Sequence, residues 1–252
     1  MTNNRKLYVI PIIHAKSDMG SMASFLEAES LRSLGERVWE QHTGVVEEFW
    51  KAIAQFFSSL NEGEAKGLKI YQDGLVADGP EGIKIVREAA KKGSKNYQII
   101  EELIDKGAIL IRTEDISVVK EEYAYIIAIS KARTPREKER ATIRYREAQA
   151  VLLQRRDRFI AKQIKETLRV GEKGALFIGA YHNILRLLPE DIEVVQVKDL
   201  DNVRKYQKLL TSPLKNQNAF QELDNLGRYL ASPIIDRYQN TTATNLVYKK
   251  LK

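Results

Sequence analysis

Five short apolar segments, separated by longer segments of helical character, most constrain the fold of this chain. They span residues 6–13, 68–72, 108–112, 175–178 and 192–197 and are rich in Val, Ile and Leu. Apolar runs this continuous are typical of strands buried on both faces, as in parallel sheets. Strands that alternate with helices predict an α/β fold, with a mainly parallel central sheet flanked by long helices. We expect one α/β domain over residues 1–200 and a helical C-terminal extension over residues 201–252 that packs on it.

The segments between the strands have apolar residues at helical spacing. We predict helices over residues 25–60, 82–92, 96–106, 116–131, 134–170, 201–210 and 219–230, a helical turn over 185–188, a loop over 15–24 and a loosely held tail over 240–252. The wide apolar stripe of the first helix suits either the core or a dimer face, so a homo-oligomer stays open. Gly35 and Gly44 are expected to bend or split that helix. Thr134 and Pro135 suit the N-cap and first position of the long helix.

Pro11 lies inside the first predicted strand. Proline cannot donate a hydrogen bond to a ladder, so it predicts an edge position or a kink at the strand end.

The composition excludes several classes of site. The chain has no cysteine, which rules out disulfides, cysteine-bound zinc, iron–sulfur clusters and thiol nucleophiles. No unbroken apolar run in the sequence, residues 9–13 included, comes near the roughly 20 residues of a membrane-spanning helix. No signal-peptide pattern is visible at the N-terminus. We therefore expect no membrane span and a cytoplasmic location.

The positive charge of the chain is concentrated in one segment. The net charge is +7, and residues 131–165 contain 12 Lys/Arg against 4 Asp/Glu. One interpretation is the solvated face of a long helix. The other is a surface that binds an anionic partner, since clustered Lys and Arg attract anions. No aromatic residues interleave with the central basic cluster in the pattern of a base-stacking platform.

Polar residues follow four of the predicted strands. They are His14, Asp73, Glu114 with Asp115, and the run Gly179-Ala180-Tyr181-His182. In parallel α/β sheets, ligands bind at the carboxyl ends of the strands. Isolated buried groups of this kind are costly, whereas groups that converge in one cleft form a site.

Two imidazoles and a carboxylate at such an edge suit a divalent metal such as Zn, Mn, Co or Fe(II). A bound metal lowers the pKa of a water ligand and makes a nucleophile at neutral pH. The alternative is that each histidine is a hydrogen-bonded loop residue. His42, the third histidine, lies mid-helix and is expected to be structural.

Arg155 and Arg156 fall on or beside the apolar stripe of the long helix. Arg156 lies four residues after Leu152 and four before Ile160. A guanidinium near the core needs an anionic partner. The partner is either an internal carboxylate that joins helix to sheet, or an anionic substrate group or developing oxyanion.

The stretch 155–161, followed after a helix by 174–182, resembles the TraB/Tiki group, which is related to the erythromycin esterase and ChaN haem-uptake proteins. In that group an early strand ends in Gly-x-x-His, a late helix carries Arg-Asp or Arg-Asn, and a second strand ends in Gly-x-x-His. Arg156-Asp157 and His182 match the last two elements. His14 matches the first only in position, because Pro11 stands where the family has glycine. The resemblance covers roughly residues 6–198.

The resemblance implies an α/β fold with paired histidines facing one cleft. Some members are described as metal-dependent proteases and others as esterases, and others bind haem. Asp73 is the nearest counterpart, by position, of an acidic residue expected after the second strand.

We therefore predict a metal-dependent hydrolase of peptide or ester bonds that acts on a small-molecule or peptide substrate. The metal ligands would be His14, His182 and Asp73. Glu114 would complete the metal shell or act as general base, as Asp73 also could. Arg156 would bind an anionic group or stabilise transition-state charge.

The remaining predicted binding residues are Arg155, Tyr181 and Asp157. Two alternatives stay open. One is a non-catalytic module that binds an anionic partner through residues 131–165. The other is a haem-binding protein with Tyr181 or His182 as axial ligand.

Overall fold

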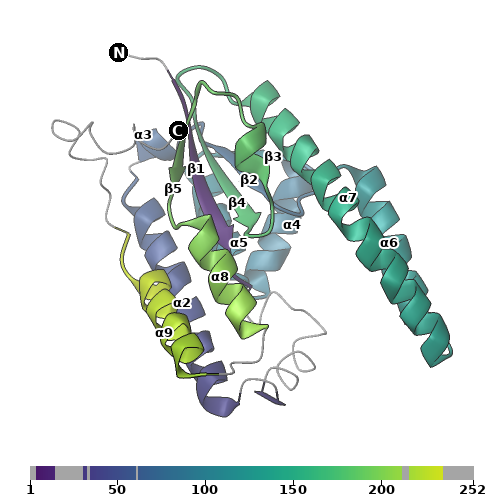
Figure 1. Ribbon diagram of the computed structural model, residues 1–252. Coiled ribbons are helices and arrows are strands. Elements are labelled where there is room, and N and C mark those ends of the chain that lie inside the picture. The colour runs from purple at the N-terminus through teal and green to yellow at the C-terminus, as the bar shows by residue number, and fades with distance from the viewer. Residues whose placement is uncertain (1–3, 15–30, 33–34, 61, 212–215, 235–252) are drawn as a thin grey trace.

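The computed structural model describes residues 4–14, 31–32, 35–60, 62–211 and 216–234. Its centre is a five-stranded sheet in which every strand pair is parallel. The strands are β1 (Arg5–Ile12), β2 (Lys69–Gln72), β3 (Ile109–Ile111), β4 (Lys173–Gly179) and β5 (Ile192–Gln196). The predicted α/β class is therefore confirmed, and the sheet is wholly parallel (Figure 1).

The order of strands across the sheet is β3-β2-β4-β1-β5, so β1 is an internal strand. An edge position for Pro11 was therefore the wrong interpretation of this strand. Pairing with β5 ends at Val9, and Pro11 pairs only with Ile178 of β4. Proline is thus tolerated where β1 has a single neighbouring strand.

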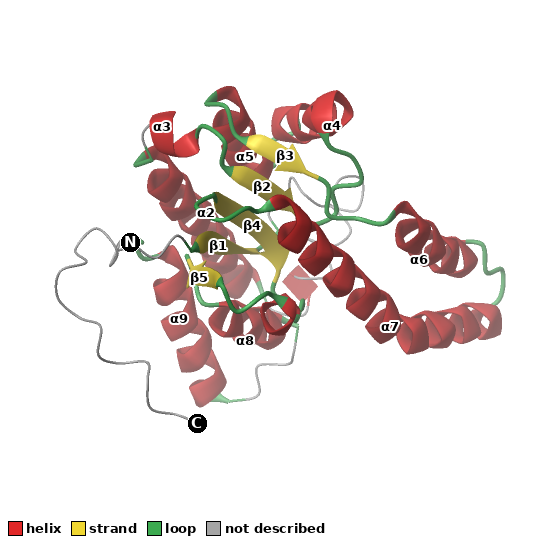
Figure 2. Ribbon diagram, turned by 90° about the horizontal axis from the view of Figure 1, so that it is seen from above, coloured by secondary structure: helices red, strands yellow, loops and turns green. Residues whose placement is uncertain are grey.

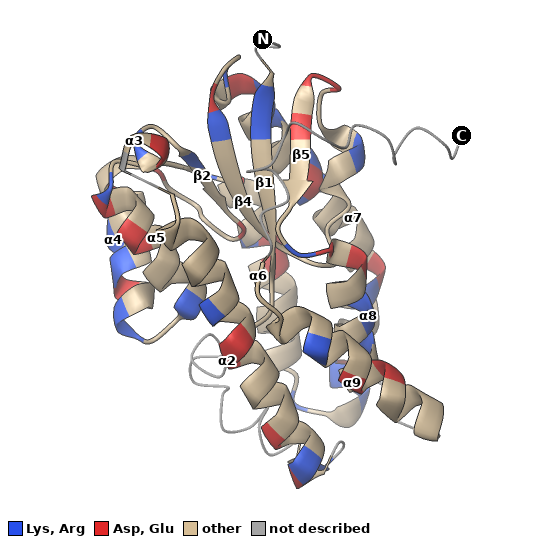
Figure 3. Ribbon diagram, turned by 90° about the vertical axis from the view of Figure 1, so that its left-hand side faces the viewer, with Lys and Arg blue, Asp and Glu red and all other residues tan. Residues whose placement is uncertain are grey.

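Successive residues of β4 point into two separate cores, as the two-residue period of a strand requires. Ala175 and Phe177 belong to a larger core, and Leu176 and Ile178 belong to a smaller core on the opposite face. All four side chains are fully buried. In Figure 3 the strands are uncharged over most of their length, and the charged residues of β1 lie at its start.

The larger core is covered by several helices. They are α2 (Glu36–Ser58), α4 (Gly79–Lys91), α5 (Lys95–Asp105), α8 (Leu200–Leu210) and α9 (Gln217–Ala231). Figure 2 shows α2 and α9 on one side of the sheet and α7 (Pro135–Thr167) on the other. Val203 of α8 and Leu230 of α9 join this core, so the C-terminal helices pack on the α/β domain.

The apolar stripe of α2 forms part of the core. Phe49 and Ile53 are fully buried in the larger core. Gly35 has a φ of 81° and directly precedes α2, whereas Gly44 lies inside an unbroken helix. The predicted helical segment before Gly35 lies almost entirely outside the described residues, as do the predicted loop 15–24 and tail 240–252.

The smaller core is covered by the second half of α7 and by the short helix η2 (Ile184–Leu187). Ile160 and Ile164 of α7 are fully buried there. The helix begins as predicted: Thr134 is its N-cap, Pro135 is its first residue, and Thr134 and Glu137 form a capping box. The first half of α7 packs beside α6 (Ile116–Ser130), and the two helices extend away from the sheet (Figures 1 and 2).

The structure adds one short helix, α3 (Glu62–Ala65), that the sequence did not predict. Among the helices that the structure describes, none has both the length and the apolar character needed to cross a membrane.

Candidate functional site

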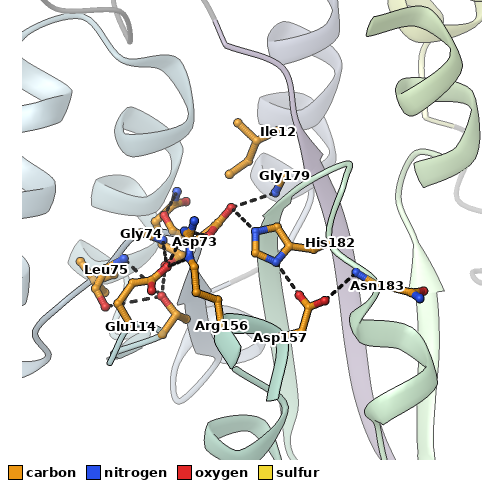
Figure 4. A network of polar contacts seen from close by, with 12 residues as sticks. Ile12, Asp73, Gly74, Leu75, Glu114, Arg156, Asp157, Gly179, His182 and Asn183 are labelled. Carbon is orange, nitrogen blue, oxygen red and sulfur yellow. Dashed lines mark hydrogen bonds and ion pairs between the residues drawn. The ribbon is translucent and has the colours of Figure 1, made fainter. Parts of the chain in front are cut away.

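Five charged residues meet at the carboxyl edge of the sheet (Figure 4). Asp73 directly follows β2, Glu114 follows β3, and His182 lies three residues beyond the end of β4. Arg156 and Asp157 reach them from α7. We call Asp73, Glu114, Arg156, Asp157 and His182 the charged cluster. All five were singled out from the sequence, and the structure brings them together.

His182 lies between two carboxylates. Its Nδ1 is 2.5 Å from Asp157 Oδ1, and its Nε2 is 3.1 Å from Asp73 Oδ2. The other oxygen of Asp157 accepts the backbone N–H of Asn183 at 3.0 Å, which fixes the carboxylate. Burial alone would lower the pKa of His182, but the hydrogen bonds and charges of Asp157 and Asp73 outweigh it and raise this pKa to about 9. The ring is therefore an imidazolium at neutral pH.

Arg156 joins the other two carboxylates. Its Nη2 donates to Asp73 Oδ1 at 2.9 Å and to Glu114 Oε1 at 2.6 Å, and its Nε donates to the same Glu114 oxygen at 2.9 Å. Burial would raise the pKa of Asp73, but His182, Arg156 and the N–H of Gly179 lower it to about 2. Asp73 is thus an anion between two cations.

Glu114 is in a different environment, with 1% of its side chain exposed. Its Oε1 accepts from Arg156 and from the N–H of Gly74, but its Oε2 has no hydrogen-bond partner within the described part of the chain. Burial raises the pKa of Glu114 despite the contact with Arg156. One guanidinium therefore contacts two carboxyl groups whose environments shift their pKa values in opposite directions.

Glycine at position 179 lets these groups approach each other. A Cβ atom there would lie 3.2 Å from Asp73 Oδ2 and 3.5 Å from His182 Cδ2. The N–H of Gly179 donates to that same Asp73 oxygen at 3.1 Å. The φ of Gly179 is not positive, so close approach rather than backbone freedom explains the glycine.

Residues that the sequence analysis did not identify hold the cluster in place. Arg204 of α8 donates to the carbonyl oxygens of Ala180 at 2.8 Å and His182 at 3.4 Å, and so fixes the loop that carries the imidazole. Gln72, which precedes Asp73, belongs to a buried hydrogen-bonded network. The other members of this network are Ser94, Asn96 and Thr113. Of these residues, only Gln72 stands out in the sequence, because it is a polar residue at the end of an apolar run.

Three predicted site residues lie outside the charged cluster. His14 is exposed, two residues beyond β1, and makes no hydrogen bond or ion pair with other described residues. Arg155 pairs with Glu121 of α6, and Tyr181 is exposed. His42 has the structural role expected of it: its Nδ1 is 3.0 Å from Tyr206 Oη, and burial lowers its pKa to about 4.

The donor set of the charged cluster does not by itself fit a divalent metal. Within the described residues, no group of three or more His, Asp or Glu side chains has the geometry to hold one. Asp73 and His182 present one facing pair, yet the other oxygen of Asp73 is bonded to the guanidinium of Arg156, whose charge disfavours a cation. Metal binding by His14, His182 and Asp73 therefore stays a prediction.

No family model matches this chain, and no curated protein or solved structure does either. The resemblance to the TraB/Tiki group therefore rests on the residues quoted above.

The ion pairs of Arg156 generate a prediction about stability. Arg156→Met leaves the buried Glu114 and Asp73 carboxylates without their shared cation, which costs about 3–5 kcal/mol of unfolding free energy. The neighbouring Arg155→Met removes one exposed pair with Glu121 and costs less than about 1 kcal/mol. Urea unfolding of the two variants measures the difference, and equal losses would contradict a structural role for the buried pairs.

The raised pKa of His182 predicts a specific pH dependence. An imidazolium favoured by folding contributes its full stability below the ordinary pKa of 6.5, and this contribution is lost as the pH rises through about 9. The stability difference between wild type and His182→Gln should fall by about 3 kcal/mol across that window. Urea unfolding at a series of pH values measures this difference, and a constant difference would contradict the charged state.

Proposed function

We propose that the charged cluster is the active site of a hydrolase that cleaves an ester or peptide bond. The observation that carries the proposal is the imidazolium of His182 held between Asp157 and Asp73 at the ligand-binding edge of a parallel sheet. Burying five ionisable side chains together is expensive, and perturbed groups of this kind are typical of catalytic sites. The resemblance to a family with esterase and protease members supports the same reaction class.

His182 is the proposed proton donor. Asp157 binds Nδ1 and orients the ring, which leaves the Nε2 proton as the one that moves. The side chains of Asp73 and Arg156 keep some exposure, so the proposal has the substrate approach the Nε2 side of the ring past these two residues.

Hydrolysis adds water across the acyl bond. The water oxygen bonds to the carbonyl carbon, the bond from that carbon to the leaving oxygen or nitrogen breaks, and the leaving atom takes the Nε2 proton of His182. Asp73 accepts a proton from the water and returns it to Nε2, which restores the starting state.

Arg156 is the proposed stabiliser of the oxyanion. Its Nη1 lies 3.8 Å from Glu122 and has no hydrogen bond to any residue in the described ranges, so its N–H groups are available. Glu114 is too deeply buried to contact a substrate, and its position suits the orientation of Arg156 better than a role as general base.

The metal and haem proposals are separate from this mechanism. A divalent ion at His14, His182 and Asp73 is tested by elemental analysis of protein purified without chelator. Haem binding through Tyr181 or His182 is tested by the Soret band on titration, although both nitrogens of His182 already have partners.

The hydrolase proposal predicts turnover that depends on the cluster. With ester and peptide substrates, His182→Asn should lower kcat/KM at least about 100-fold, and Asp157→Asn should lower it by a similar factor because the ring loses its orientation. Lys162→Met, which changes an exposed residue of the same helix, is the matched control and should keep full activity. Absence of turnover in wild type, or turnover unchanged in His182→Asn, would remove the proposal.

A second proposed function is the binding of an anionic partner by the basic segment. What favours it is that the Lys and Arg residues between 131 and 146 are exposed, on the loop before α7 and on the part of α7 that extends away from the sheet. Substituting Arg136, Lys138, Arg140 and Arg144 with Gln should abolish binding to heparin, used as a polyanion probe. Binding by wild type should weaken steeply with salt, and failure to bind at low salt would contradict this function.

A further inference from the structure

A two-helix arm extends from the molecule beside the sheet (Figures 1 and 2). We define the arm as α6 together with residues 135–151 of α7. The two helices pack side by side, and the rings of Tyr125 and Tyr145 have centroids 6.1 Å apart. Tyr145 Oη also donates to Glu122 at 2.8 Å. One side of α6 is therefore covered by α7.

A different side of α6 carries a second apolar stripe, which we call the outer stripe. It comprises Ile116, Val119, Tyr123 and Ile126, at spacings of three, four and three residues. Ile116 is 53% exposed, Tyr123 61% and Ile126 47%. This spacing is that of a helix seam which packs against another helix.

α6 is unusually apolar for a helix with this exposure. Of its 15 residues only Lys120, Glu121 and Glu122 are charged, yet Val118 is its only buried residue. A helix that is apolar around most of its circumference is normally covered, and contiguous exposed patches of this kind mark interaction surfaces.

We propose that the outer stripe is the interface of a homodimer, in which α6 of one chain packs against α6 of a second copy. Identical stripes can meet across a two-fold axis, because such an interface uses the same surface on both partners. Two arms joined in this way form a four-helix bundle, an arrangement that antiparallel helix pairs readily adopt. The proposal is independent of the proposed hydrolase activity.

The charge distribution favours a second copy over an anionic occupant. The three charged residues of α6 sum to one negative charge, whereas the basic residues between 131 and 146 lie on the following loop and on α7. An anionic lipid surface or nucleic acid would thus meet a single positive charge on α6, Lys120, next to two glutamates. A second, nearly neutral α6 adds little like charge at the stripe itself, and the repulsion that remains comes from the basic residues of the loop and α7.

The size of the outer stripe predicts a weak dimer. A helix of 15 residues is about 22 Å long and about 10 Å wide. One such helix face is smaller than the ~800 Å² that each partner buries in a stable complex, so we expect association at micromolar rather than nanomolar concentration.

Sedimentation equilibrium of the full chain, from about 1 to about 200 µM, tests the proposal. Wild type should be a dimer. Tyr123→Glu combined with Ile126→Glu should raise the dissociation constant at least about 100-fold, because each copy loses two buried apolar contacts. Ile143→Glu is the matched control: it changes an exposed isoleucine of the arm that lies on α7, and it should leave the dimer intact. Circular dichroism establishes that each variant is folded.

Salt separates this interface from binding of an anionic partner. Raising NaCl from about 0.1 to about 0.5 M should maintain or strengthen the dimer, because screening reduces repulsion between the two basic arms. A wild-type chain that stays monomeric at the highest concentration overturns the proposal. So does a dimer that survives the double substitution, or one that only Ile143→Glu dissociates.

Discussion

The guanidinium of Arg156 is the interaction on which the rest of the site depends. It bonds to Asp73 at the end of β2 and to Glu114 beyond β3, and so ties α7 to two strand ends at once. Without this cation, two buried carboxylates would face each other, at a high cost in free energy. The next residue of the helix is Asp157. The position and orientation of α7 that bring Arg156 to its two carboxylates therefore also place the carboxylate of Asp157 beside His182.

Much of this arrangement follows from local patterns in the sequence. Apolar runs predicted all five strands, because strands covered on both faces leave no room for polar residues. A parallel sheet then places every strand's carboxyl end at one edge, which explains why Asp73, Glu114 and His182 meet although they are far apart in the chain. Arg156 was identified because a guanidinium beside an apolar stripe needs an anion, and its partners are internal carboxylates.

Other features depend on tertiary contacts that leave no local trace. From the sequence, Arg155 and Arg156 were equally good candidates for a buried ion pair. Successive residues of a helix differ in direction by about 100°, so Arg155 pairs with Glu121 instead. Arg204 acts through backbone carbonyls of a distant loop, so no sequence pattern identifies it. Paired histidines suggested a shared metal, whereas both nitrogens of His182 face carboxylates. The internal position of β1 depends on strand order, which a proline cannot reveal.

The position of β4 between β1 and β2 has a consequence for how the chain reaches this state. Among the described strands, β1 pairs with β4 and β5 alone, and their residues come more than 150 positions later. During synthesis, the apolar strand β1 therefore has no partner strand until most of the polypeptide has left the ribosome. Pairings so distant along the chain form slowly and leave intermediates open to aggregation. In the newly made N-terminal half, β1 therefore lacks both of the strands that flank it in the finished sheet.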